Sequence, residues 1–190
     1  MKFKIILILV LFLSTYSIVS IINNYNKINY KAISQTNKPI NNNLSNKKNK
    51  KLELQWDIPN GWNEIEGNDF SLAVYELKIL DNSAKISITE FPGDAGGTEN
   101  NVNRWRRQVG LPDQKLSTIN QNTKYDVNKL GRYEIHHIIN NDNPDLGFLC
   151  MIQKLDSSTI FVKMQSTLNG IKQLENIFND FCFSFSYVNT

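Results

Sequence analysis

The sequence is poor in the residues that build disulfide scaffolds and metal sites, with two cysteines and two histidines among 190 residues. Two cysteines are too few for a disulfide-dense fold. Two possibilities remain open: one Cys150–Cys182 disulfide, or two buried free thiols. His136 and His137 are adjacent on a predicted strand, so they point to opposite faces and cannot share one metal ion. The sequence therefore predicts neither a metal site nor a cofactor.

Acidic residues are missing from the first 51 positions, which hold nine lysines and so carry a net charge of +9. Residues 52–190 hold 12 basic and all 18 acidic groups, a net of −6. The basic character of the chain thus belongs to its N-terminal part and not to its globular part. A nucleic-acid-binding domain needs a basic face of its own, so we expect no nucleic acid among its partners.

The N-terminal part contains eighteen consecutive uncharged residues, 5–22, after Lys2 and Lys4. A short basic start before an apolar core is typical of a secretory signal peptide. Eighteen helical residues at about 1.5 Å each also nearly span a bilayer core of about 30 Å, as a retained anchor would. Residues 1–22 are therefore predicted to be one apolar helix, either a cleaved signal peptide or a membrane anchor. If it is uncleaved, the membrane is a partner through residues 5–22.

The lysines on the two sides of this segment balance, so the positive-inside rule does not orient it. The resemblance of the basic start to a signal sequence favours an exported protein of the cell envelope, on the periplasmic side or secreted. Residues 23–51 are rich in Asn and Lys and predict a flexible linker. A polybasic segment attracted to anionic lipid is the alternative for this linker.

The globular part, 52–190, alternates strand-like hairpins with two well-separated helical patterns. This order predicts an α+β fold, an antiparallel β-sheet flanked by two main helices. The predicted strands are 70–80, 84–91, 132–139, 146–154, 159–165 and a short final strand at 183–187. The second helix is predicted to begin at Asn169.

The first helix is the better marked of the two. Thr98 suits the N-cap, and Gly110 suits the left-handed position after the last turn. Val102, Trp105 and Val109 share one face at helical spacing, which predicts a buried Trp105.

A glycine-rich segment, 93–97, precedes this helix. Its spacing matches neither a P-loop nor a dinucleotide-binding fingerprint, and Asp94 and Glu99 would repel an anion. We expect a tight turn that lets the helix pack against the sheet. No nucleophile motif or carboxylate pair is present in the sequence, and Cys150 lies in an apolar strand where a thiol is inert. No catalytic residue is predicted.

Three arginines lie together on the first helix of an otherwise acidic domain. Arg104, Arg106 and Arg107 are either solvated or form a site for an anion or a protein partner. The sequence leaves both interpretations open.

Several blocks of the sequence resemble a family of uncharacterised exported bacterial proteins, of planctomycete and verrucomicrobial type. The blocks are Trp56-x-x-Pro-x-Gly-Trp62, Phe91-Pro-Gly-Asp-Ala-Gly-Gly97, Asn101-Val-Asn-Arg-Trp-Arg-x-Gln-x-Gly-Leu-Pro112 and Phe161-Val-Lys-Met164. The resemblance covers roughly residues 52–188 and departs at Ser166–Leu168, where the family tends to have a fuller Gly-Pro turn. It implies a PsbP-like α/β/α sandwich whose members mostly bind or assemble partners without catalysis.

The resemblance also makes the polar residues of the third block a candidate site or a buried network. We therefore expect a non-enzymatic binding or assembly protein, exported or membrane-tethered, whose partner is an unknown protein or a small anionic ligand. The alternative is a small-molecule-binding or hydrolytic domain with its site at the Gly93–Gly97 loop, and the third possibility is a purely structural envelope protein. The candidate ligand- or partner-binding residues are Asp94, Asn101, Asn103, Arg104, Arg106, Arg107 and Gln108.

Overall fold

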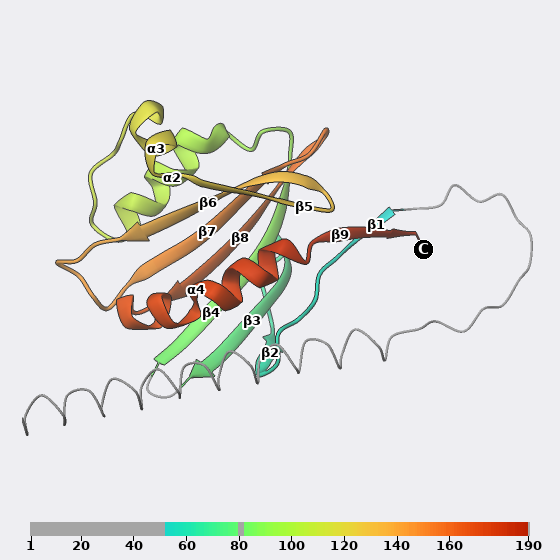
Figure 1. Ribbon diagram of the computed structural model, residues 1–190, viewed down its shortest axis with the longest axis horizontal. Coiled ribbons are helices and arrows are strands. Elements are labelled where there is room, and N and C mark those ends of the chain that lie inside the picture. Colours follow the sequence, from blue (N-terminus) through green and yellow to red (C-terminus); the bar gives the residue numbers. More distant parts are fainter. Residues whose placement is uncertain (1–51, 80–81, 190) are drawn as a thin grey trace, which may run out of the picture. The chain divides into compact units, whose positions relative to one another are not determined.

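The computed structural model describes residues 52–79 and 82–189 (Figure 1). The predicted signal peptide or anchor at 1–22 and the predicted linker at 23–51 lie outside the described residues, and so does the predicted membrane contact of residues 5–22. Within the described ranges, no helix is both long and apolar enough to cross a bilayer.

Seven strands form one fully antiparallel sheet in the order β2-β3-β4-β8-β7-β6-β5. They are β2 (Trp62–Ile65), β3 (Ser71–Ile79), β4 (Asn82–Pro92), β5 (Lys124–Asn128), β6 (Gly131–Ile139), β7 (Gly147–Lys154) and β8 (Ser158–Ser166). A separate pair joins the two ends of the described chain, because β1 (Leu52–Gln55) runs antiparallel to β9 (Ser186–Asn189). Figure 1 shows this pair beyond the C-terminal end of helix α4.

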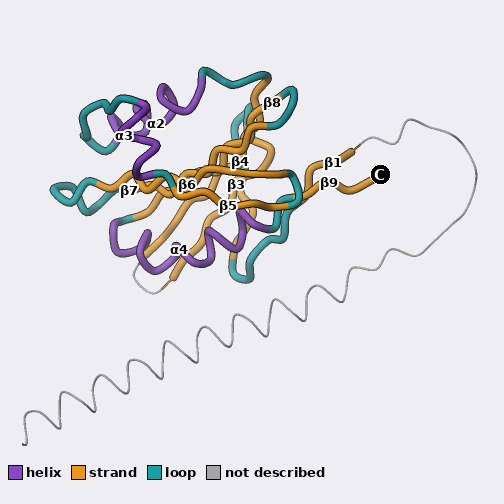
Figure 2. The backbone as a smooth tube through the Cα atoms, turned by 45° about the horizontal axis from the view of Figure 1, so that its top comes forward, coloured by secondary structure: helices purple, strands orange, loops and turns teal. Residues whose placement is uncertain are grey.

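Helices cover both faces of the sheet (Figures 1 and 2). One face packs against α4 (Leu168–Phe183), and the other carries α2 (Gly97–Gln108) and the short α3 (Leu116–Asn122). The predicted α+β class with a large antiparallel sheet between helices is thus confirmed. The prediction of two main helices omitted α3.

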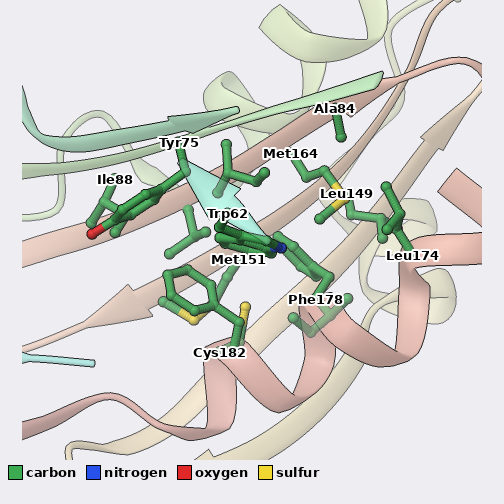
Figure 3. Close-up of a cluster of buried hydrophobic side chains, with 14 of the residues drawn as sticks. Trp62, Tyr75, Ala84, Ile88, Leu149, Met151, Met164, Leu174, Phe178 and Cys182 are labelled. Carbon is green, nitrogen blue, oxygen red and sulfur yellow. The ribbon is translucent and has the colours of Figure 1, made fainter. Parts of the chain in front are cut away.

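The central strand β7 shows why the two faces hold separate cores. Leu149 and Met151 point toward α4, whereas Phe148, Cys150 and Ile152 point toward α2. Because both faces are buried, the strand is apolar along nearly its whole length. Figure 3 shows the α4-side cluster, in which Trp62 packs with its ring centroid 4.7 Å from that of Phe181.

Both predicted helix starts were wrong by one or two residues. Helix α2 begins at Gly97, and its N-cap is Gly96 with φ 85°, a left-handed conformation that favours glycine. Thr98 therefore lies inside the first turn rather than at the cap. Helix α4 begins at Leu168, and its N-cap Thr167 accepts a hydrogen bond from the backbone N–H of Gly170. The left-handed Gly110, with φ 78°, agrees with the prediction.

The two cysteines are free thiols, both fully buried. Cys150 belongs to the core under α2 and Cys182 to the core under α4, on opposite faces of the sheet. Of the two possibilities that the sequence left open, the structure shows the free thiols.

Candidate functional site

The loop before α2 is a tight turn, as its sequence predicts. The Asp94 side chain accepts a hydrogen bond from Gly96 N at 3.1 Å, and the Asp94 carbonyl accepts one from Gly97 N at 2.9 Å. Gly93, Gly96 and Gly97 all have positive φ. Asp94 is exposed and shapes the turn through these two bonds.

Asn101 holds this turn against the helix. Its Nδ2 donates to the carbonyls of Ala95 and Gly97 at 2.9 and 2.8 Å, and its Oδ1 accepts from Arg104 Nη2 at 2.9 Å. The side chain is 4% exposed, so each of these bonds satisfies a buried polar group.

Asn103 holds the opposite end of the helix. Its Nδ2 donates to the carbonyl of Gln114 and its Oδ1 accepts from the backbone N–H of Gln114, both at 2.8 Å. The two asparagines are two residues apart on α2, so they leave the helix in different directions and each fixes a different loop.

Two of the three arginines also bind the loop after α2. Arg106 Nε donates to the carbonyl of Pro112 at 2.8 Å, and burial lowers the pKa of its guanidinium. Arg107 forms a salt bridge of 2.7 Å with Asp113, in which both side chains are more than half exposed.

Gln108 is exposed and accepts a hydrogen bond from Lys163 Nζ of strand β8 at 2.7 Å. The same ammonium lies 3.8 Å from the centroid of the Phe148 ring, within cation–π distance. Burial lowers the pKa of Lys163, and the nearby Arg104 lowers it further. Arg104 and Lys163 are therefore neighbouring cations on the α2 face of the sheet.

The seven predicted site residues thus divide among different places. Asp94, Asn103, Arg106 and Arg107 have their polar groups engaged by the loops at the two ends of α2. Asn101 and Arg104 come together at a groove, and Gln108 reaches Arg104's neighbour Lys163. A binding role for these residues stays a prediction.

This groove, called here the aromatic groove, has a volume of about 290 Å³. It is lined by Phe91, Pro92, Ala95, Asn101, Arg104 and Phe161. The rings of Phe91 and Phe161 lie 6.1 Å apart, and Phe161 packs edge-on against the buried Trp105. Phe70 continues the row at 6.3 Å from Phe91 and is 68% exposed.

A second and larger hollow, the α2 cleft, lies on the other side of the helix start and has a volume of about 630 Å³. The first turn of α2, helix α3 and strands β5, β6 and β7 surround it. Its lining consists of Gly96, Gly97, Thr98, Glu99, Asn100, Leu116, Asn120, Tyr125, Arg132, Tyr133, Glu134, Ile152 and Lys154.

A hydrogen-bonded chain of side chains lies beside this cleft. Glu134 Oε2 accepts from Thr98 Oγ1 at 3.0 Å and lies 3.1 Å from His136 Nε2. The other ring nitrogen of His136 lies 3.4 Å from Thr123 Oγ1. Burial raises the pKa of Glu134, but the hydrogen bonds from His136 and Thr98 outweigh it, so the pKa lies below its ordinary value.

The sequence analysis did not predict these hydrogen-bonded side chains, although the spacing of two of them was a signal. Glu134 and His136 are two residues apart on a strand, so they share a face. The sequence predicts Thr98 as a helix cap, and no local pattern shows that its side chain contacts strand β6. The two histidines do point to opposite faces, since His137 Nε2 lies 2.9 Å from Glu175 Oε1 of α4.

Cys150 is the cross-strand neighbour of His136, yet the pair does not form a nucleophile site. The thiol is fully buried, and burial raises its pKa well above the ordinary value. Among residues 52–79 and 82–189, no group of three or more His, Cys, Asp or Glu side chains is placed to hold a metal ion.

No protein-family model matches the sequence, and no curated protein matches it. Among solved structures, the chain is similar to the solution structure of cyanobacterial PsbP (CyanoP) from Synechocystis sp. PCC 6803. The identity is 16% and the TM-score 0.44, over 77% of this chain and 98% of that one.

The chain is also similar to the crystal structure of LpqN, involved in cell envelope biogenesis of Mycobacterium tuberculosis. The identity is 7% and the TM-score 0.39, over 75% of this chain and 87% of that one. Both TM-scores lie below 0.5, so membership of a particular family stays a prediction from the sequence.

Proposed function

We propose that this is an exported protein of the cell envelope whose folded part is a non-enzymatic binding domain, and that it docks a partner protein in the aromatic groove. The observation that carries the proposal is the position of Arg104, a guanidinium at a groove with Phe91 and Phe161 in its lining. Aromatic side chains and arginine are the residues that contribute most to binding energy at protein interfaces.

Arg104 differs from the two other arginines of α2 in the hydrogen-bond partners of its guanidinium. Arg106 and Arg107 bind the loop that follows the helix. Arg104 is exposed, and its hydrogen bond runs to Asn101 Oδ1. A guanidinium has five N–H donors in a planar fork, so Arg104 keeps donors for a carboxylate.

The charges near the groove indicate what the partner presents. Arg104 and Lys163 are neighbours, whereas residues 52–190 as a whole carry a net charge of −6. An acidic segment is repelled by most of the domain and attracted at this place. The partner segment therefore carries a carboxylate beside an aromatic or long aliphatic side chain.

Phe70 enlarges the apolar part of this surface. A phenylalanine that is 68% exposed and lies against Phe91 keeps apolar area in water that a partner would cover. The predicted N-terminal segments add the location to this proposal: an apolar segment at 1–22 and a linker at 23–51 would hold the domain near a membrane surface.

Selection of phage-displayed peptides on the full-length chain tests the proposal with a defined probe. Enriched sequences should combine an acidic residue with an adjacent aromatic or long aliphatic one. Their binding should be about tenfold or more weaker in Arg104→Gln, and it should also be reduced in Phe70→Ser. Arg107→Gln is the matched control, since it removes the same charge from the same helix away from the groove.

Two outcomes would overturn the proposal. One is enrichment of peptides without an acidic residue, and the other is equal binding to the wild type and to Arg104→Gln. Melting temperatures of the variants separate loss of binding from loss of folding.

A further inference from the structure

The residues that line the α2 cleft are not part of the aromatic groove and have no role in the proposed docking of a protein partner. We infer that it binds a small organic anion with an apolar body, the anionic group between Arg132 and Lys154 and the body against Leu116 and Tyr125. This site is separate from the aromatic groove, so the inference does not depend on the proposed function.

The two cations lie on the same face of neighbouring strands. Glu134 of β6 pairs with Ile152 of β7. Arg132 precedes Glu134 by two residues and Lys154 follows Ile152 by two, so both side chains share that face and that end of the strands. Both residues line the cleft.

Within the described ranges neither cation forms a salt bridge, although Lys154 lies close enough to the Glu134 carboxylate to help lower its pKa. The salt bridges seen there involve Arg107, Lys124 and the two histidines, and none reaches Arg132 or Lys154. Both side chains are exposed and line the same cleft, so an anion bound there is attracted by each of them.

Arg132 is also held in place. Its guanidinium carbon lies 3.9 Å from the centroid of the Tyr125 ring, which fixes the plane of the group while its edges remain able to donate. A donor that is already positioned loses less side-chain entropy when an anion binds.

The apolar part of the ligand is indicated by two exposed residues in the same lining. Leu116 of α3 is 41% exposed and Tyr125 of β5 is 42% exposed. Ile152 of strand β7 belongs to the same lining. A cleft of about 630 Å³ is within the range of small-molecule sites.

The acidic residues of the lining limit the charge of the ligand. Glu134 already accepts from Thr98 and lies against His136, and Glu99 is exposed in the first turn of α2. Two carboxylates in the same lining disfavour a second negative charge on the ligand. The class is therefore a compact monoanion with an uncharged apolar body.

Nuclear magnetic resonance of the isotope-labelled full-length chain tests this with three probes. Naphthalene-1-sulfonate carries both the anion and the apolar body, 1-naphthol only the body, and inorganic sulfate only the anion. We expect the sulfonate to shift the amides of Gly97–Asn100 and of β6 and β7 saturably, and to bind at least about tenfold tighter than either simpler probe.

Variants of exposed residues complete the test. Arg132→Gln/Lys154→Gln should weaken sulfonate binding about tenfold or more, and Leu116→Ser should weaken it with the charges intact. Arg107→Gln/Lys172→Gln removes two charges elsewhere and should leave binding unchanged, as should Arg104→Gln. Melting curves establish that each variant is folded.

Equal affinity for sulfate, equal affinity for 1-naphthol, or shifts confined to the aromatic groove would each overturn the inference. Binding that survives the loss of both cations would do the same. If the protein binds anionic phosphatidylglycerol vesicles but does not bind the sulfonate saturably, the inference is overturned, and the two cations would be assigned to a lipid surface instead.

Discussion

Asn103 and Gln114 are joined by two reciprocal hydrogen bonds of 2.8 Å, in which one side-chain amide satisfies both main-chain groups of one residue. Through these two bonds the Asn103 side chain pairs with the backbone of Gln114 and connects the loop after α2 to the helix. Replacing it by Ala leaves the Gln114 N–H and carbonyl unpaired in a part-buried place. We expect Asn103→Ala to lower the free energy of unfolding by about 2–3 kcal/mol.

Urea denaturation of Asn103→Ala beside Asn100→Ala measures this loss. Asn100 lies on the same helix, is exposed and makes one bond, to the Gly96 carbonyl. Its replacement should change stability by less than about 1 kcal/mol. Equal effects of the two substitutions would show that the Gln114 bonds do not matter.

The α4-side counterpart of this arrangement is a buried pair of amides. Asn128 Nδ2 donates to Gln153 Oε1 at 2.9 Å, and Gln153 Nε2 donates back to Asn128 Oδ1 at 2.7 Å. Gln153 is fully buried, so Gln153→Ala removes one side of a satisfied pair and should cost about 3 kcal/mol. The exposed Gln165 of β8 provides the control substitution in the same denaturation experiment.

The salt bridge between Arg107 and Asp113 should contribute little. Both side chains are more than half exposed, and exposed ion pairs contribute about 0–1 kcal/mol. Arg107→Gln should therefore leave the melting temperature nearly unchanged, with the small difference shrinking in high salt. A large loss of stability in Arg107→Gln at any salt concentration would contradict this.

The Glu134 carboxylate should make the stability of the domain depend on pH in the acid range. Despite its burial, its carboxyl has a pKa below its ordinary value, because His136 and Thr98 donate hydrogen bonds to it. A depressed pKa in the folded state stabilises the fold above the unfolded pKa, and this stabilisation is lost as the pH falls through the folded pKa. Stability measured from pH 6 downward should therefore fall less in Glu134→Gln than in the wild type.

Thr98→Val tests the cause of that shift. It removes one of the two donors to Glu134, so its acid profile should lie between those of the wild type and Glu134→Gln. Identical profiles for all three proteins would mean that another group governs the acid range.

The two thiols should be unreactive in the native chain. Burial raises the pKa of both Cys150 and Cys182 and leaves neither accessible. Iodoacetamide at pH 8 should label neither residue in the folded protein and both in urea, as mass spectrometry of peptides would show. Rapid labelling of Cys150 in the native protein would contradict this and would indicate a reactive thiol beside His136.

The sequence predicts the well-marked parts of this fold for identifiable reasons. Val102, Trp105 and Val109 recur at helical spacing and are all buried under α2. The shorter elements carry no such signal: α3 has seven residues of which only Ile119 is buried, and the four leading residues of the edge strand β5 are exposed. Pattern-based prediction depends on alternation between buried and exposed positions, and these elements show almost none.

The roles of the polar residues were beyond a local pattern. Asn103 acts on Gln114 eleven residues away, and Thr98 meets Glu134 across thirty-six. The α2 cleft needs the register of β6 with β7, which brings Arg132 and Lys154 to one face. What the sequence does show is that polar groups and arginines concentrate on α2.

Most polar residues of α2 hold the adjoining loops, whereas we propose that Arg104 binds a partner. The most direct test is the affinity of a selected acidic–aromatic peptide for the wild type, Arg104→Gln and Arg107→Gln, measured by calorimetry on the full-length chain. We predict binding about tenfold or more weaker for Arg104→Gln alone, with all three melting temperatures nearly equal. Equal weakening in Arg107→Gln, or undiminished binding by Arg104→Gln, would contradict this role of Arg104.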